Sequence, residues 1–420
     1  MNNVTKTTLG KITLSIFDGK HGDCENLSGS GCYFISVKDL RDYDIDYSNA
    51  REITPADFAQ NYTRTKFENG DTIYANTGDT IGKSLFVKDN PLANRTSFQK
   101  SVAILKPNTK YVEPQYLYYL LKYETPRLRQ ASTGSGQKNL LLSTMRDFSL
   151  SIHDRATQKQ IVAVLGCIDD KIRCNNRIND NLQQQLKLLY DYWFTQFDFP
   201  DEKGQPYKSS GGPMYRPKNA PYAVPNGWRV ENVYQNTLTS IIKPGVKPFT
   251  TKTYLATAEV NGVAISNGTA IEFATRESRA NMQPSENSIW FAKMKNSIKH
   301  LYLNSHMKQF VERSILSTGF CGLQCSVQSF EYIASFIEHS YFETIKDTLA
   351  HGATQEAVNN DDLAGIALVI PSERVLLKYH ELTKGIYAQI SQTICENQAL
   401  TQLRDWLLPM LMNGQATIGD

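Results

Sequence analysis

The stretch 155-RATQKQIVAVLGCIDDKIRCNNRINDNLQQQLKLLYDYW-193 decides how this chain is organised. Its apolar residues recur alternately four and three positions apart, which is the heptad pattern of a helix that packs along a second helix. The positions of this seam are Ile161, Leu165, Ile168, Ile172, Asn175, Asn179, Leu182, Leu186, Leu189 and Trp193. The stretch therefore predicts a long helix over residues 156–198, with a partner helix elsewhere in the chain.

A similar apolar stripe near the C-terminus predicts a second long helix over residues 372–412. Its seam positions are Leu382, Ile386, Ile390, Leu400, Leu403 and Leu407, with Tyr379 and Leu411 beyond them. Both stripes become polar halfway along, at Asn175 and Asn179 in the first helix and at Thr393, Glu396 and Asn397 in the second. If the helices pack along their full length, these polar positions face each other and fix the register. The alternative is two amphipathic helices that each lie on their own domain.

The chain also matches itself, without gaps, at a constant offset of 218 residues. The matched pairs are Gln137/Gln355, Met145/Leu363, Phe148/Ile366, Leu150/Leu368, Ile152/Ile370, Ile168/Ile386, Ile172/Ile390, Asn179/Asn397, Leu182/Leu400 and Leu189/Leu407. Self-similarity at a fixed period is the signature of a repeated structural unit. The offset therefore predicts a duplication in which a front part and a long helix occur twice.

The front part of each copy mixes short runs of β-branched and aromatic residues with helical stretches and turn residues. The predicted fold class is mixed α/β, with two globular domains joined by two long helices. Six prolines between Phe199 and Trp228 exclude a periodic element and predict a linker. The predicted order is a first domain (1–155), a helix (156–198), a linker (199–228), a second domain (229–371) and a helix (372–412).

Composition and charge restrict the cellular compartment of the chain, but they do not identify its partner. The net charge of +3 and the pI near 8.3 permit nucleic acid as a partner but do not require it. Seven cysteines, an odd number spread over 420 residues, indicate reduced thiols and not a disulfide framework. No membrane span and no signal peptide is predicted, so we expect a cytoplasmic chain.

Motifs that would carry catalysis are incomplete. Residues 77–84, TGDTIGKS, place three residues between the two glycines where a phosphate loop needs four, and a strand-like run follows; they predict a hairpin turn. Asn90-Pro91 begins like the motif of amino-methyltransferases but lacks the second proline and the aromatic ring.

Metal-binding and nucleolytic patterns are missing as well. Cys321 and Cys325 stand four apart and Cys167 and Cys174 seven apart, but neither pair has a second Cys or His pair at zinc-like spacing. No Asp–Glu–Lys cluster of the nuclease type is present. We therefore expect no metal, no cofactor and no catalytic residue in this chain.

Basic and polar residues remain as candidate contacts to DNA. Residues 276–313 contain seven Lys or Arg against three Glu, with aromatic residues interleaved. Basic side chains supply phosphate contacts, and polar neighbours can read base edges. The candidates are Lys20, His21, Asn76, Thr77, Lys83, Gln99 and Lys100 in the first copy, and Arg276, Arg279, Lys293, Lys295, Lys299 and His300 in the second. The alternative for each residue is an ordinary solvated surface.

Several segments together resemble the specificity subunits of Type I restriction-modification systems. Residues 192–212, YWFTQFDFPDEKGQPYKSSGG, resemble the stretch that follows the first helix in that family, and residues 155–185 resemble the helix itself. PNGWRV at 225–230 and TIGK at 80–83 are similar to further family segments. The second half departs more: LAHGATQEAVNN is a looser version of GSGQKNLLL, and the second helix lacks the Gln-Lys-Gln start.

The resemblance implies a non-catalytic DNA-recognition chain. Each globular domain would read one half of a split, asymmetric DNA sequence, and the two helices would form an antiparallel coiled coil. Two methyltransferase subunits and separate restriction (motor) subunits would be partners, and S-adenosylmethionine, ATP and Mg would be bound by those partners. The rival interpretation is a coiled-coil protein-interaction scaffold, which the low net charge favours slightly.

Overall fold

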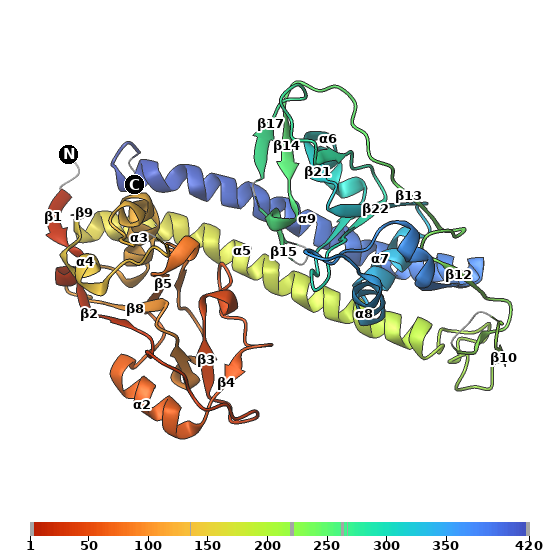
Figure 1. Cartoon of the computed structure of the whole chain (residues 1–420), viewed down its shortest axis with the longest axis horizontal. Helices are drawn as coiled ribbons and strands as arrows, with labels where there is room; N and C mark the ends of the chain where they lie inside the picture. Colours follow the sequence, from red (N-terminus) through yellow and green to blue (C-terminus); the bar gives the residue numbers. More distant parts are fainter. Residues whose placement is uncertain (1–3, 135, 219–221, 262–263, 267, 417–420) are drawn as a thin grey trace. The chain divides into compact units, whose positions relative to one another are not determined.

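The computed structural model describes residues 4–134, 136–218, 222–261, 264–266 and 268–416, in two compact units. The first unit consists of residues 1–173 and 403–420, and the second of residues 174–402. Each unit contains a mixed α/β part and a portion of the two long helices, α5 (Arg155–Tyr190) and α9 (Glu373–Met412). The α/β fold class predicted from the sequence is therefore confirmed, and Figure 1 labels its elements.

The first unit is built on a four-stranded antiparallel sheet in the order β2-β8-β5-β6. These strands are β2 (Thr13–Asp18), β8 (Val102–Pro107), β5 (Thr72–Ala75) and β6 (Ser84–Phe86). A second sheet has the order β4-β3-β7, with β4 (Arg51–Glu52), β3 (Tyr33–Ile35) and β7 (Thr96–Phe98), and β3 runs parallel to β7. β1 (Val4–Thr8) pairs with β9 (Ser149–His153). The short helices are α1 (Leu9–Ile12), α2 (Pro55–Thr65), α3 (Pro114–Gln130) and α4 (Leu142–Asp147).

Helix α3 joins the sheet of the first unit to the long helices. It begins with Pro114 at its first turn, where a missing N–H costs nothing, and it buries Tyr116, Leu117 and Leu120. These side chains share one hydrophobic core with Leu165 of α5 and Leu408 of α9. In the first unit, therefore, the globular part and both helices are packed as one body.

The second unit repeats this plan with more strands. A four-stranded antiparallel sheet has the order β13-β22-β19-β20, with β13 (Thr239–Ile241), β22 (Phe320–Cys325), β19 (Ser288–Ala292) and β20 (His300–Leu303). A second sheet, β17-β14-β21-β18, contains β17 (Thr269–Ile271), β14 (Lys252–Leu255), β21 (Ser314–Ser317) and β18 (Ala280–Met282). The pairs are β10 (Met214–Tyr215) with β11 (Val224–Pro225), β12 (Arg229–Asn232) with β23 (Ala367–Ile370), and β15 (Val260–Asn261) with β16 (Ala264–Ile265). The helices are α6 (Lys308–Arg313), α7 (Phe330–Glu338) and α8 (Ser340–Leu349).

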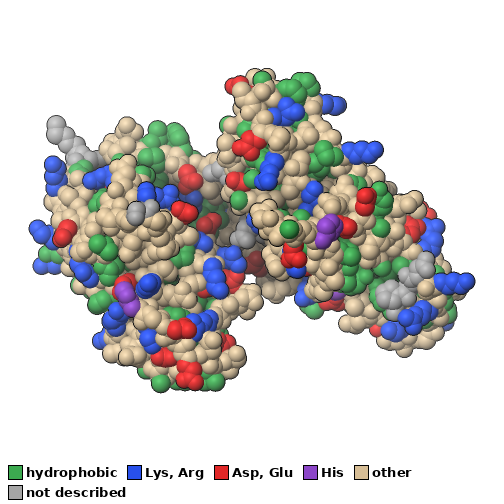
Figure 2. Space-filling model, in the orientation of Figure 1, with side chains coloured by type: hydrophobic (Ala, Val, Ile, Leu, Met, Phe, Trp, Pro, Cys, Tyr) green, Lys and Arg blue, Asp and Glu red, His purple; other side chains and the backbone are tan. Residues whose placement is uncertain are grey.

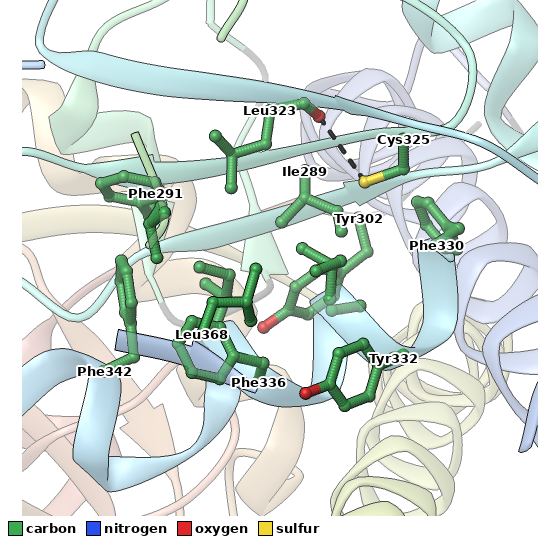
Figure 3. Packing of buried hydrophobic residues seen from close by; sticks show 14 of the residues in the cluster. Ile289, Phe291, Tyr302, Leu323, Cys325, Phe330, Tyr332, Phe336, Phe342 and Leu368 are labelled. Carbon is green, nitrogen blue, oxygen red and sulfur yellow. Dashed lines mark hydrogen bonds between the residues drawn. The ribbon is translucent and has the colours of Figure 1, made fainter. Parts of the chain in front are cut away.

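The core of the second unit lies between the β19–β22 strands and helices α7 and α8 (Figure 3). Ile289 and Leu323 point from the strands toward Phe336 of α7, and Phe291 packs edge-on against Phe342 of α8 at 4.8 Å between ring centroids. Aromatic edge-to-face pairs of this kind add to the burial of apolar area.

The duplication predicted at 218 residues is visible in the elements themselves. β8 occupies residues 102–107 and β22 residues 320–325, which is the same offset at both ends. The parallel strand pairs β3–β7 and β14–β21 also correspond, since β7 begins at Thr96 and β21 at Ser314. One difference is that α3 is continuous, whereas its counterpart is broken at His339 into α7 and α8.

The two long helices pack against each other, as the heptad pattern predicts. In the second unit their polar middles are in contact. Asn175 donates to Glu396 (2.7 Å) and Asn397 (2.9 Å), and Thr393 donates to Asn179. Residue numbers rise along α5 as they fall along α9, so the helices are antiparallel. A buried polar contact of this kind fixes which seam positions meet.

The seam residues proposed for α5 face inward. Ile161, Leu165, Ile168, Ile172, Asn179 and Leu186 are buried, and Leu182 and Leu189 are half-buried. On α9, Ile390 is buried and Ile386, Leu400 and Leu407 are half-buried.

The predicted α9 seam is wrong at two positions, because Leu382 is 53% and Leu403 43% exposed. The next residues along the chain, Thr383 and Arg404, are buried in their place. Both are polar, so an apolar pattern read from the sequence passes over them and selects the exposed leucine beside each.

The described residues of the proline-rich segment, 199–218 and 222–228, belong to the second unit, and several of their aromatic rings pack together. Phe199 stacks on Trp228 (4.9 Å between ring centroids) and on Tyr207 (4.7 Å). Trp228 is among the most deeply buried side chains. Contrary to the expectation of no periodic element, the two-residue strands β10 and β11 pair within this segment. The prolines also do not prevent three aromatic rings from burying apolar area together.

Candidate nucleic-acid interface

The structure brings the candidate residues of the first copy together at one edge of the first unit. The main-chain N–H of Lys20 donates to the carbonyl of Phe98 (2.8 Å), and that of Asn76 donates to the carbonyl of Ser101 (3.1 Å). Residues 76–83 form the turn between the antiparallel strands β5 and β6, as predicted for TGDTIGKS. Three segments far apart in the sequence, 19–21, 76–83 and 98–101, thus meet. We call them the first edge.

Several cations of the first edge already have partners. Lys20 forms an ion pair with Asp57 of α2 (2.7 Å), and the ring of His21 is within hydrogen-bond distance of Asp18 (2.6 Å). The ammonium group of Lys83 donates to the carbonyl of Val37 (3.3 Å), and partial burial lowers its pKa. These side chains are less available to a phosphate than the sequence suggests.

Asn76 is a correction to the predicted contacts. It is buried, and its side-chain amide, with the nitrogen facing the acceptors, donates to the carbonyl of Ser101 (2.7 Å). Its function in this position is to hold the edge together. Thr77 is half-buried beside Asn139 (3.4 Å), and Gln99 is also half-buried, whereas Lys100 is exposed.

The equivalent edge of the second unit is formed by the turn between β19 and β20. The main-chain N–H of Lys293 donates to the carbonyl of Gly319 (3.0 Å), which joins this turn to the start of β22. Lys295 is paired with Glu356 (2.8 Å), and the ammonium group of Lys299 donates to the carbonyl of Thr257. We call residues 293–299 and 317–319 the second edge.

Arg279 and Arg276 lie on the connection between β17 and β18. The carbonyl of Arg279 accepts from the N–H of Thr318 (2.9 Å), so this exposed arginine borders the second edge. Arg276 lies over the ring of Phe273 (4.2 Å) and donates to that residue's carbonyl (2.9 Å).

His300 is the clearest error among the predicted contacts, because its side chain is only 1% exposed. Its ring lies between Glu338 of α7 (2.9 Å) and Glu343 of α8 (3.0 Å), and Lys346, also buried, binds Glu343 (2.6 Å). Burial by itself would lower the pKa of His300, but the hydrogen bonds to the two carboxylates outweigh it and raise the pKa to about 9. The histidine is therefore part of an internal charge network that joins β20 to α7 and α8.

Sequence reasoning missed two loops, residues 133–139 and 351–357. The N–H of Gly78 donates to the carbonyl of Lys138 (2.7 Å), so the first loop lies on the first edge. The N–H of Lys295 donates to the carbonyl of Glu356 (3.0 Å), so the second loop lies on the second edge. The match of Gln137 with Gln355 was the available signal, but it pointed only to a repeat.

In the part of the chain that the structure describes, no group of three His, Cys, Asp or Glu side chains has the geometry of a metal site. Cys321 is buried within β22, and burial raises the pKa of its thiol to about 12. Every helix in the same ranges is too short or too polar to span a bilayer. On the face shown in Figure 2, basic and acidic side chains are interspersed.

Comparisons with known proteins point to one family. A family model described as "Type I restriction modification DNA specificity domain" matches residues 24–184. The HindI specificity subunit of Haemophilus influenzae is 24% identical over 399 residues, covering 82% of this chain and 86% of the relative. The MjaIX specificity subunit of Methanocaldococcus jannaschii is 24% identical over 405 residues, covering 93% and 88%.

Two solved structures are similar over most of their length. The S subunit of a Type I restriction-modification system from M. genitalium has a TM-score of 0.47 at 13% identity and covers 98% of this chain and 96% of its own. The HsdS subunit of Thermoanaerobacter tengcongensis has a TM-score of 0.32 at 12% identity, covering 98% and 97%.

Proposed function

Since the chain belongs to the specificity subunits of Type I restriction-modification systems, we propose that it reads a DNA target in two parts, one with each edge. As a specificity subunit it recognises DNA and is itself non-catalytic. The observation that carries the two-part target is that the same edge is built twice from segments 218 residues apart. Residues 1–155 and 229–371 would be the two readers, and residues 156–198 and 372–412 the helices between them.

The chemistry of the edges supports contact with DNA more than contact with a sugar or a protein. Lys100 in the first unit and Arg279 in the second are exposed, and no ion pair is seen for either within the described ranges. Exposed cations next to polar turns are the groups that bind phosphates and reach base edges. A protein-interaction scaffold would not need a basic group at equivalent edges of two units.

Partners and cofactors follow from the same proposal. The chain would direct methyltransferase subunits, two per chain, and restriction subunits to the target. Those partners would bind S-adenosylmethionine, ATP and Mg, while this chain would bind none of them. The relatives come from a bacterium and an archaeon, and a protein that reads chromosomal DNA there acts in the cytoplasm.

Exchange of one reader tests the proposal. Residues 1–155 are replaced by the matching segment of a relative, the variant is expressed with its methyltransferase partner, and methylated motifs are found by methylation-aware sequencing. One half of the motif should change and the other should stay. The matched control replaces residues 229–371, which should change the opposite half. If either exchange changed both halves, or neither did, the two-reader proposal would be wrong.

A further inference from the structure

The two loops outside the predicted site share features of the backbone at their described residues, 133–134 with 136–139 and 351–357. Each contains a glycine in the left-handed region, Gly134 at φ 118° and Gly352 at φ 137°. A side chain at Gly134 would lie 2.5 Å from the carbonyl oxygen of Gln137, and one at Gly352 would lie 2.5 Å from that of Gln355. Both turns therefore need glycine, and both present a glutamine three residues later.

The loops are also closed and attached in the same way. Thr133 and Asn139 exchange two main-chain hydrogen bonds (3.0 and 2.7 Å), as do His351 and Ala357 (3.2 and 3.0 Å). Each loop then accepts an N–H from the neighbouring edge, as described above. The donor to the first loop is Gly78 and the donor to the second is Lys295, so corresponding turns of the two edges hold the two loops through the same kind of main-chain hydrogen bond.

A structural role does not explain the two glutamines. Gln137 and Gln355 are exposed, and no hydrogen bond of either side chain is seen within the described ranges. A glutamine kept for folding would be buried or would hold a partner. The side chain of Gln137 lies over Gly78 of the first edge, and both glutamines are exposed beside the edges that we propose to contact DNA.

Side chains in and around the two loops have diverged, whereas the glycine and the glutamine are present in both. At the 218-residue offset, Lys138 corresponds to Glu356 and Lys100 to Thr318. Two readers of different half-sites must differ where they read bases, but they can share contacts to the phosphate backbone, which is the same in every sequence.

On the basis of the proposed function, we infer that Gln137 and Gln355 each donate to a DNA phosphate, one in each half-site. Glutamine side chains are regular phosphate donors in protein–DNA complexes. Because a hydrogen bond from a neutral donor to a charged acceptor is stronger than one between neutral groups, loss of either glutamine side chain should weaken DNA binding roughly tenfold. Because glutamine carries no charge, its loss should leave the salt dependence of binding unchanged.

The test uses the full chain in complex with its methyltransferase partner. Gln137→Ala, Gln355→Ala and the double variant are titrated against DNA that carries the methylated motif, at several salt concentrations. We expect each single variant to bind about tenfold more weakly. The double variant should show the product of the two losses. Motif and salt slope should stay as in the wild type. The matched control is Gln328→Ala, an exposed glutamine beyond the opposite end of β22, which should bind as the wild type does.

Each other outcome has a definite meaning. Binding within twofold of the wild type overturns the inference. A changed methylated motif also overturns it, because the glutamine would then read a base. Loss of complex assembly in size-exclusion chromatography would show that the loops bind the protein partner instead. A wild-type motif without two half-sites would overturn the proposed function and this inference with it.

Discussion

Replacing Arg404 of α9 by methionine tests whether a buried ion pair holds the first unit together. The guanidinium donates to Asp169 of α5 (3.2 Å) and to the hydroxyl of Tyr43, and Tyr119 of α3 donates to the same carboxylate (2.6 Å). Arg404 and Asp169 are only 8% and 5% exposed. Methionine retains most of the volume but leaves the carboxylate buried with Tyr119 as its remaining partner.

The expected cost follows from that geometry. Removing one partner of a buried ion pair destabilises a protein by about 3–5 kcal/mol, because the other charge stays out of water without compensation. For a unit of this size, each kcal/mol lowers the melting temperature by roughly 2–4 °C. Arg404→Met should therefore lower the transition of the first unit by on the order of 10 °C. Adding Asp169→Asn removes the unpaired charge, and most of the loss should be recovered.

Scanning calorimetry measures the transition, and hydrogen exchange of α3 amides locates the effect in the first unit. The matched control is Arg374→Met on the same helix, whose ion pair with Glu202 is exposed at 47% and 86%. An exposed pair contributes about 1 kcal/mol or less. If Arg404→Met melted within about 2 °C of this control, or if Asp169→Asn failed to rescue it, the pair would not hold the unit together.

Three further predictions concern the second unit and the edges. The pKa of His300 is raised to about 9, so the stability that its protonated ring contributes is complete below about pH 6.5 and is lost as the pH rises through 9. Chemical unfolding at pH 6 and pH 10 should show this loss of stability in the wild type and not in His300→Gln. In the same assay, Ile390→Ala should lower the free energy of unfolding by about 2–5 kcal/mol and Leu382→Ala by about 0.5 kcal/mol or less. Equal losses would mean that the apolar stripe in the sequence, and not the observed burial, marks the seam. Lys100→Ala and Lys138→Ala should each lower the salt slope of DNA binding by about 0.9; an unchanged slope would place both lysines away from phosphates.

Much of the architecture could be predicted from the sequence, because it depends on patterns that are local in the chain. The heptad spacing from Ile161 to Leu189 predicts a helix with a partner, and burial of that face is what such spacing requires. The repeat at 218 residues predicts two equivalent halves, which the strands β8 and β22 show. The three-residue gap between Gly78 and Gly82 excludes a phosphate loop, and a hairpin turn stands there.

The positions of polar groups were decided by tertiary structure. His300 reads as a surface residue in a basic segment, and it becomes internal because Glu338 and Glu343, about forty residues later, supply two carboxylates. Lys20 reads as a free cation, but α2 places Asp57 beside it. On α9 the sequence selects Leu403, whereas the fold buries Arg404 because Asp169 of another helix lies opposite.

The physical reason is the same in each case. An apolar side chain gains by leaving water whatever it meets, so spacing predicts the burial of most of the α5 stripe, but Leu382 and Leu403 of α9 stay exposed because the fold buries a polar neighbour of each. A polar or charged side chain is buried only where another group satisfies it. In this chain those groups come from distant segments, and only the folded structure shows which segments they are.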